Sequence, residues 1–200
     1  MQYYRARASL RATIAAPLLA ATLAGCAALV PEAPSAIFDL SAPEDARAGG
    51  RTGLQVLVPQ PTAVKALDTD RIAARPAPSQ YAYLPNAVWS DQLPRLLQAR
   101  LMQTLQSSGR VRAAGLPGQG LLIDYQLVVD IRAFELRDEG AVVELAVKLM
   151  DDTNGRVLRA RTFRQVVPVA STDNATVVAA LDAATDAAFR EITRWAFARG

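Results

Sequence analysis

Alternating apolar and polar residues predict consecutive strands in the C-terminal half of the chain. In the stretch LLIDYQLVVDIRAFEL, every second residue from Ile123 to Ile131 is large and apolar, and most residues between them are polar. This period of two is typical of a strand that buries one face and leaves the other solvated. The alternation returns in AVVELAVKLM, and the hairpin signal Asn154-Gly155 precedes RVLRARTFRQVVPV. The pattern predicts a three-stranded antiparallel meander over residues 121–169.

Two other segments repeat apolar residues at steps of three to four, the spacing of an amphipathic helix. In the first, the apolar stripe starts at Trp89 and continues through five leucines. An N-cap at Asp91 would place Pro94 in the first turn, where its missing N–H costs nothing, and Gly109 marks the predicted end. The second helix is predicted over residues 174–198, where alanines allow close packing.

The part of the chain before the first helix has shorter patterns. Short strands are predicted at IFDL (37–40) and LQVLVP (54–59). The stretch 60–86 is too polar and too often broken by proline for a helix, so it is predicted to be irregular, with two short strands near Arg71–Arg75 and Gln80–Leu84. The order strands, helix, strands, helix predicts a single α+β domain. In this domain a mixed or antiparallel sheet carries two amphipathic helices packed on one face.

The N-terminus has the order of regions found in a secretory signal peptide. Three arginines and no acidic residue come first, and an apolar run follows that is shorter than the roughly 20 residues needed to cross a bilayer. The run ends in Leu23-Ala24-Gly25-Cys26, which resembles a bacterial lipobox. In that motif the peptidase cleaves before the cysteine, whose thiol is acylated and which becomes the new N-terminal residue. The alternative is an ordinary signal peptide, or a buried helix, with an incidental cysteine.

Cys26 is therefore predicted to be a lipid-attachment site. It is the only cysteine in the chain, so it has no intrachain disulfide partner. One acyl chain binds a membrane only marginally, and bacterial lipoproteins of this kind carry three, such as palmitate. Ala27 follows the cysteine, and by the sorting rule of Gram-negative lipoproteins this favours the outer membrane.

These features divide the chain into three parts. Residues 1–25 are predicted to be the lipoprotein signal peptide, and residues 26–36 the lipidated cysteine with a tether that prolines keep extended over about 30 Å. Residues 37–200 are predicted to form the one folded domain.

Charge and composition exclude several classes of function. The formal net charge of +3 comes from the three arginines of the signal peptide, so the chain from Cys26 onward has equal numbers of basic and acidic residues. This balance gives no support for nucleic-acid binding. The chain contains no histidine, which removes histidine-based catalysis and histidine metal ligands. We expect no catalytic residue, no metal and no cofactor other than the covalent lipid on Cys26.

Two charged motifs have more than one interpretation. The stretch DDTNG at 151–155 superficially suggests a Ca²⁺ loop, but it lacks the length and closing Glu of an EF-hand, which favours a solvated hairpin turn. Arginines cluster on the last predicted strand, and they indicate either a charged sheet surface or a contact with an acidic partner or lipid headgroups. These arginines are Arg156, Arg159, Arg161 and Arg164.

Tyr81, Tyr83 and Trp89 crowd into nine residues before the first helix. Such aromatic residues belong either to the core or to a partner-binding patch, because Tyr and Trp are frequent anchors of interfaces. Both interpretations stay open at this point.

Motifs along nearly the whole chain resemble one family. They are the lipobox, FDL, LQVLVP, ALDTDRIAAR, NAVWSDQLPRLLQARLMQTLQSSGRV and LVVDIRAFE. In this order and spacing they resemble the PqiC-like auxiliary lipoproteins of ABC-type transport systems, which act with MCE-domain proteins. The proline-rich RPAPSQ before the first helix departs from the family pattern.

The resemblance implies a non-enzymatic lipoprotein on the periplasmic face of the outer membrane. Its partners would be the membrane, through the lipid anchor, and the MCE-domain protein of a system that moves phospholipids or other hydrophobic molecules between the two membranes. A ring-like homo-oligomer would match the rings that MCE proteins form. The alternative is an outer-membrane assembly lipoprotein that partners a β-barrel in lipopolysaccharide export.

Overall fold

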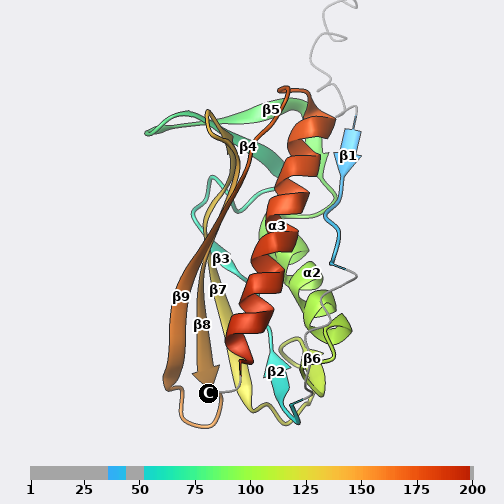
Figure 1. Cartoon of the computed structure of the whole chain (residues 1–200), viewed down its shortest axis with the longest axis vertical. Helices are drawn as coiled ribbons and strands as arrows, with labels where there is room; N and C mark the ends of the chain where they lie inside the picture. The colour runs from blue at the N-terminus through green and yellow to red at the C-terminus, as the bar shows by residue number, and fades with distance from the viewer. Residues whose placement is uncertain (1–35, 44–51, 199–200) are drawn as a thin grey trace, which may run out of the picture. The chain divides into compact units, whose positions relative to one another are not determined.

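The computed structural model describes residues 36–43 and 52–198. Cys26, its lipobox residues Leu23, Ala24 and Gly25, and the tether up to residue 35 lie outside the described residues, so the predictions for them stay predictions. Within the described ranges, nine strands form one mixed sheet with two helices (Figure 1). This confirms the predicted single α+β domain.

The C-terminal half of the sheet is the predicted meander. Strands β7 (Tyr125–Arg137), β8 (Gly140–Asp151) and β9 (Val157–Val167) pair antiparallel in sequence order. Apolar residues meet across the strands, as in the pairs Leu127–Leu149 and Leu145–Phe163, and these residues are buried. The alternation in the sequence therefore corresponds to one buried face.

The other edge of β7 is shared by three strands from the N-terminal half. Strands β2 (Gln55–Leu57), β3 (Thr62–Ala63) and β4 (Arg71–Ala77) pair with it in parallel, one after another along its length. The sheet is completed by β6 (Ala113–Gly115) beside β2, β5 (Gln80–Trp89) beside β4, and β1 (Ala36–Phe38) beside β5. β7 is thus the strand on which the whole sheet is assembled.

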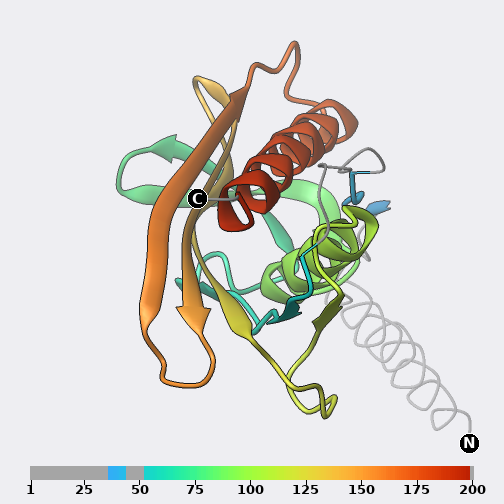
Figure 2. The same ribbon diagram turned by 60° about the horizontal axis from the view of Figure 1, so that its bottom comes forward.

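Both helices lie on the same face of the sheet, as predicted (Figures 1 and 2). Helix α3 (Asn174–Ala196) packs over β8 and β9, and α2 (Leu93–Ser107) lies beside it. The predicted N-cap of α2 is wrong by one residue: Gln92 occupies the cap, because the Asp91 carboxylate accepts a hydrogen bond from the neighbouring amide instead. The predicted end is confirmed, since Gly109 follows the last turn with a φ of 65°.

The core lies between the sheet and the two helices. The sheet and both helices contribute large side chains that are at most 2% exposed. They include Trp89, Leu97, Leu101, Leu127, Phe134, Phe163 and Phe189. Ala184 and Ala188 are fully buried on α3, where their small size lets the helix approach the strands. No helix in the described part of the chain has the length and hydrophobicity needed to cross a bilayer.

The segment 60–86 is more regular than predicted. The two strands expected near Arg71–Arg75 and Gln80–Leu84 extend to Ala77 and Trp89, and they form a long hairpin, β4–β5. The alternation that normally reveals strands is hidden here by prolines and by alanines on both faces. The hairpin extends beyond the end of β7 and projects from the sheet (Figure 1).

Candidate functional site

The two tyrosines of the predicted aromatic patch lie on the β4–β5 hairpin, each beside an arginine. The Arg75 guanidinium lies 4.9 Å from the centre of the Tyr81 ring, and that of Arg71 lies 3.8 Å from the centre of the Tyr83 ring. These distances are within the range of cation–π interactions. Tyr83 also donates a hydrogen bond of 3.2 Å to the Ala66 carbonyl. Both tyrosines are half-buried, so part of each ring remains accessible.

Trp89 does not belong to that patch. It is the last residue of β5 rather than part of α2, it is only 2% exposed, and its ring packs edge-on against Phe134 at 5.8 Å. The interpretation of Trp89 as partner-facing is therefore wrong, and its interpretation as a core residue holds.

A break in the strand register separates Trp89 from the tyrosines. Between the pairs Ala73–Tyr83 and Arg71–Val88, one residue of β4 is opposed by four of β5. Within this irregular stretch Asn86 adopts a φ of 52°. Because three is an odd number, the three additional residues of β5 move the side chains that follow them to the opposite face of the sheet.

A buried carboxylate holds two arginines side by side near the tip of the hairpin. Glu135 on β7 has a side chain with 0% exposure. Its Oε1 accepts hydrogen bonds from Arg137 Nε at 2.8 Å and from Arg75 Nη1 at 3.4 Å, and it lies 2.6 Å from Arg137 Nη2. Because these contacts end on the same oxygen, the two guanidinium groups are neighbours.

Glu135 faces away from the helices because of a bulge in β7. The pairing with β8 shifts between Ile131 and Ala133, so one residue is added and the alternation changes phase. After the bulge Phe134 enters the helix-covered core, and Glu135 lies on the opposite face. Arg75 of the hairpin reaches over this face and contributes to the burial of the carboxylate.

Further ion pairs continue from Arg137 across the end of the sheet. Arg137 Nη1 lies 3.9 Å from Glu139 in the β7–β8 turn, Glu139 pairs closely with Arg164 of β9, and Arg164 lies 3.5 Å from Glu144 of β8. Six alternating charges therefore run from the hairpin to the edge strand. We call this series the charge chain: Arg75, Glu135, Arg137, Glu139, Arg164 and Glu144.

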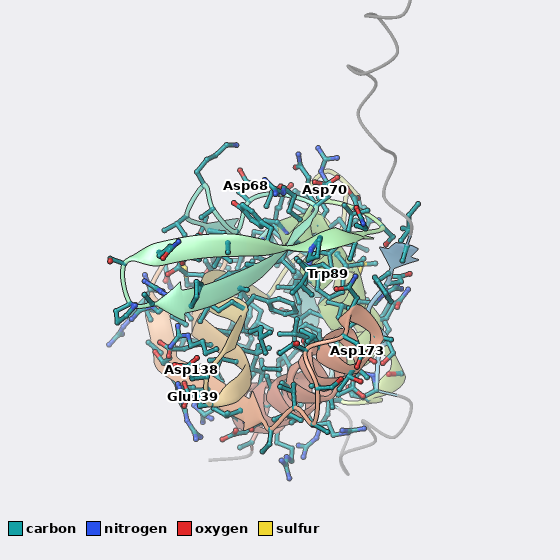
Figure 3. All side chains as sticks on the ribbon, turned by 90° about the horizontal axis from the view of Figure 1, so that it is seen from above. Asp68, Asp70, Trp89, Asp138, Glu139 and Asp173 are labelled. Atoms are coloured by element: carbon teal, nitrogen blue, oxygen red, sulfur yellow. The ribbon has the colours of Figure 1, made fainter. Side chains whose placement is uncertain are left out.

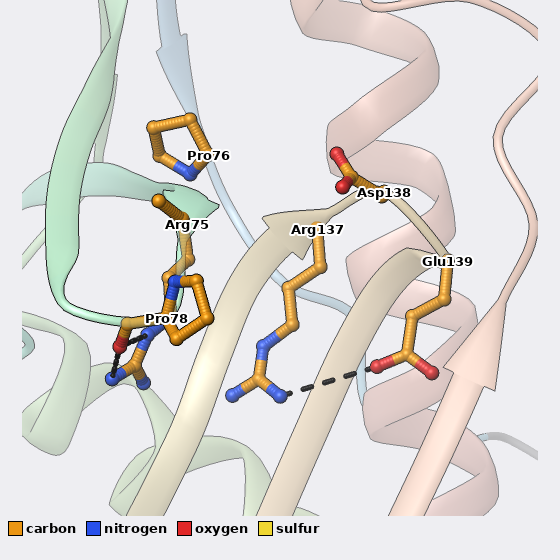
Figure 4. Close-up of a pocket in the computed structure, with 7 residues that line it drawn as sticks. Arg75, Pro76, Pro78, Arg137, Asp138 and Glu139 are labelled. Carbon is orange, nitrogen blue, oxygen red and sulfur yellow. Dashed lines mark hydrogen bonds and ion pairs between the residues drawn. The ribbon is translucent and has the colours of Figure 1, made fainter.

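A hollow of about 500 Å³ opens beside the two guanidinium groups (Figure 4). It is lined by the hairpin tip, residues 76–78, and by Arg75, Arg137, Asp138 and Glu139. A second hollow of about 390 Å³ shares both arginines and has a mostly apolar lining that includes Leu136 and Val169. Seen from this end of the molecule, Asp138 and Glu139 lie on the side of the hairpin's free end, whereas Trp89 lies toward its base (Figure 3).

The environment of Tyr81 keeps its hydroxyl neutral. Burial raises the pKa of Tyr81 above 10, and the negative charge of Glu135 raises it further. The Tyr81 hydroxyl accepts a hydrogen bond of 3.4 Å from Arg75 Nη1. At neutral pH this site therefore presents a neutral hydroxyl beside two permanent positive charges.

The other charged motifs have local roles. On β9, Arg159 donates to the Trp195 carbonyl at 2.9 Å and Arg161 pairs with Glu191 at 2.6 Å, so both side chains fasten the strand to α3. In the 151–155 stretch, the Asp151 carboxylate accepts the Thr153 amide at 2.9 Å, as in a hairpin turn. Across residues 36–43 and 52–198, no group of three His, Cys, Asp or Glu side chains is arranged to hold a metal ion.

The charge chain was not anticipated from the sequence. Its signal is Glu135, an acidic residue between the apolar Phe134 and Leu136 in a strand that is otherwise buried at this point. A buried carboxylate requires a partner, and Arg137, two residues further along, is the nearest candidate. The contribution of Arg75 depends on the hairpin and is invisible in the sequence.

Fold and site together define the class: a one-domain α+β protein whose sheet bears two helices on one face and an arginine-rich hairpin at one end. The chain belongs to the family of ABC-type transport auxiliary lipoprotein components, whose model matches residues 38–193. This confirms the resemblance found in the sequence motifs.

The chain is also similar to individual proteins. An uncharacterised protein of Bradyrhizobium diazoefficiens is 28% identical over 162 residues, which are 79% of this chain, and the match spans only 44% of the relative's length. A crystal structure of a Xanthomonas campestris protein is 29% identical, covers 82% of this chain and 95% of its own, and superposes with a TM-score of 0.72. A second crystal structure, of an uncharacterized protein, has 19% identity, coverage of 80% and 96%, and a TM-score of 0.64, a likeness of fold alone.

Proposed function

We propose that this protein is a lipid-anchored, non-catalytic auxiliary component of an ABC-type system that moves phospholipids or other hydrophobic molecules between the two membranes. In this proposal Cys26 carries the lipid, and the domain lies on the periplasmic face of the outer membrane. Its direct partner is the MCE-domain protein of the same system.

The family match over residues 38–193 carries the proposal. The lipobox before Cys26 and the short tether support an anchored domain that stays close to a membrane. The electrical neutrality of the chain from Cys26 onward means that long-range attraction to a partner is weak, so docking depends on short-range contacts. The chain has no histidine, so acid–base catalysis by histidine has no part in the proposed role.

The hairpin is the proposed docking surface. Tyr81 and Tyr83 are half-buried on an element that projects beyond β7, and their rings lie beside arginines. Tyr and Arg are enriched among the residues that dominate interfaces. A ring of several copies, which would match the symmetry of an MCE assembly, is part of the proposal.

Copurification tests the proposal. The full-length chain, expressed with the MCE and ABC proteins encoded beside it, should retain the MCE protein after crosslinking, and copies of the chain should crosslink to one another. Tyr81→Ala and Tyr83→Ala should weaken this capture while the melting temperature stays within a few degrees of wild type. Tyr125→Ala, at the opposite end of β7, changes a similarly half-buried tyrosine and should leave capture intact.

Three results would each count against one part of the proposal. If wild type captures a β-barrel protein and no MCE protein, the assembly-lipoprotein alternative replaces the transport function. If the tyrosine variants fold normally and still capture the MCE protein, the transport function stands and the docking surface lies elsewhere. Fatty-acid labelling that persists in a Cys26→Ser chain would show that Cys26 is not the anchor.

A further inference from the structure

Two guanidinium groups near the tip of the hairpin retain hydrogen-bonding capacity toward the hollow that they line. Arg137 Nη1 approaches Glu139 only at 3.9 Å, which is longer than a hydrogen bond. Arg75 Nη2 donates to the Pro78 carbonyl at 2.6 Å and carries a second N–H. The two side chains are 27% and 26% exposed, so a ligand can reach them.

The buried carboxylate fixes these two groups in place. Glu135 holds both arginines through one oxygen, and a single negative charge leaves the three groups with one net positive charge. The second oxygen, Oε2, is buried and has no hydrogen-bond partner among the described residues. Arginines held in this way lose little side-chain entropy when they bind a ligand, because their positions are already set.

Two acidic side chains, Asp138 and Glu139, also line the hollow, so the positive charge is local to the two guanidinium groups. Glu139 is paired closely with Arg164, and so its charge is largely compensated. Asp138 lies in the exposed β7–β8 turn, where water and salt screen it.

We propose that Arg75 and Arg137 form a binding site for a phosphate group, as a monoester or diester. Planar guanidinium groups bind phosphate oxygens in pairs, and two neighbouring ones can hold a tetrahedral anion from two sides. The mostly apolar hollow that shares both arginines provides space for the organic part of the ligand. A phospholipid headgroup and a soluble phosphate ester both supply this chemistry. The assignment of a lipid as the ligand rests on the proposed transport function, whereas the assignment of a phosphate site rests on the two arginines alone.

Calorimetric titration of the full-length chain in an uncharged detergent tests the site. The probes are inorganic phosphate, glycerol 3-phosphate and dihexanoyl phosphatidylglycerol, with dihexanoyl glycerol as the lipid that lacks phosphate. Affinity for the phosphatidylglycerol at least tenfold above that for glycerol 3-phosphate, with no binding of the diacylglycerol, identifies a lipid ligand. Equal affinity for the two phosphate compounds identifies a soluble phosphate ester.

Matched variants separate loss of the site from loss of the fold. Arg137→Gln alone leaves the buried carboxylate with less charge compensation, which can unfold the chain. The main variant is therefore Glu135→Gln/Arg137→Gln, which keeps the net charge of the chain and replaces the ion pair with two amide side chains that can hydrogen-bond to each other. It should melt cooperatively and bind the phosphate probes about tenfold to a hundredfold more weakly. Arg75→Gln should weaken binding as well. Arg156→Gln, an exposed arginine in the β8–β9 turn, should leave it unchanged.

The inference is overturned if none of the three phosphate probes binds wild type, or if the folded double variant binds them as well as wild type does. Either result, obtained while the chain still captures its MCE partner, removes the phosphate site and leaves the proposed function standing. Conversely, arginine-dependent binding of glycerol 3-phosphate alone, without MCE capture, would retain the site and remove the proposed function.

Discussion

Removing Arg137 should destabilise the fold more than removing Glu135, although each change breaks the same ion pair. The Glu135 side chain is 0% exposed, whereas the Arg137 side chain is 27% exposed. Arg137→Ala leaves a buried carboxylate whose remaining cation, Arg75, is 3.4 Å away. An inadequately compensated buried charge costs about 3–5 kcal/mol of unfolding free energy.

Glu135→Ala has the smaller expected cost, about 1–2 kcal/mol, because the two arginines that it leaves can turn toward water. Glu135→Leu should cost less still, since an apolar side chain of similar size refills the space and requires no partner. Combining it with Arg137→Ala should recover most of the stability lost in Arg137→Ala alone. This rescue would show that the cost comes from the buried charge rather than from lost arginine contacts.

Urea unfolding of the full-length chain in neutral detergent, followed by tryptophan fluorescence, measures these differences. Both tryptophans, Trp89 and Trp195, lie in the folded domain and report on its core. The slope of the free energy against urea should stay constant across the variants, so that midpoints compare stabilities directly. If Glu135→Ala proves as destabilising as Arg137→Ala, or if Glu135→Leu fails to rescue Arg137→Ala, the desolvation argument is wrong.

Three further changes test other parts of the structure. Trp89→Ala should lower the free energy of unfolding by about 3–5 kcal/mol in the same assay, and its coupling energy with Phe134→Ala should be about 0.5–1.5 kcal/mol. A loss near zero would contradict the assignment of Trp89 to the core. Gly140→Ala should cost about 2–3 kcal/mol, because its φ is 123° and a Cβ would come within 2.3 Å of the Val167 carbonyl oxygen; wild-type stability would refute this clash. Asp173→Ala should lower the melting temperature by a few degrees, because the Asp173 carboxylate caps α3. Hydrogen bonds from a serine hydroxyl and the capped amide lower the pKa of Asp173 to about 2, so the capping contribution is complete above pH 4 and is lost as the pH falls toward 2; an unchanged difference between wild type and Asp173→Ala at pH 6 and pH 3 would contradict this.

The meander and the helices were predictable because their signals are local. Buried residues alternate with more exposed ones from Leu127 to Ile131 in β7 and from Val143 to Leu149 in β8, and in α3 the buried residues recur at three to four positions. These periods follow from backbone geometry, which each segment obeys by itself. The end of α2 was likewise predictable from Gly109, because glycine adopts a positive φ without steric strain.

The candidate site was not predictable because it depends on two breaks in strand periodicity and on long-range pairing. The bulge in β7 moves Glu135 to the helix-free face, and the irregular stretch around Asn86 separates Trp89 from the tyrosines. Nothing in the local sequence fixes where such insertions fall. Arg75 and Glu135 are brought together by the parallel pairing of β4 with β7 across sixty residues, as their contact shows.

The dependence of the N-terminal strands on β7 has a consequence for the order of folding. Thr62 contacts Asp130 across 68 residues, and Gln55 contacts Asp124 across 69, while β2, β3 and β4 pair with β7 rather than with one another. Such distant contacts form late, because the loops between them must close first. During synthesis, which proceeds from the N-terminus, β2 and β3 therefore have no parallel partner in β7 until about residue 137 has emerged. If residues 1–25 are the signal peptide that the sequence predicts, this order leaves the precursor extended for longer, so that a translocon can engage it before the sheet closes.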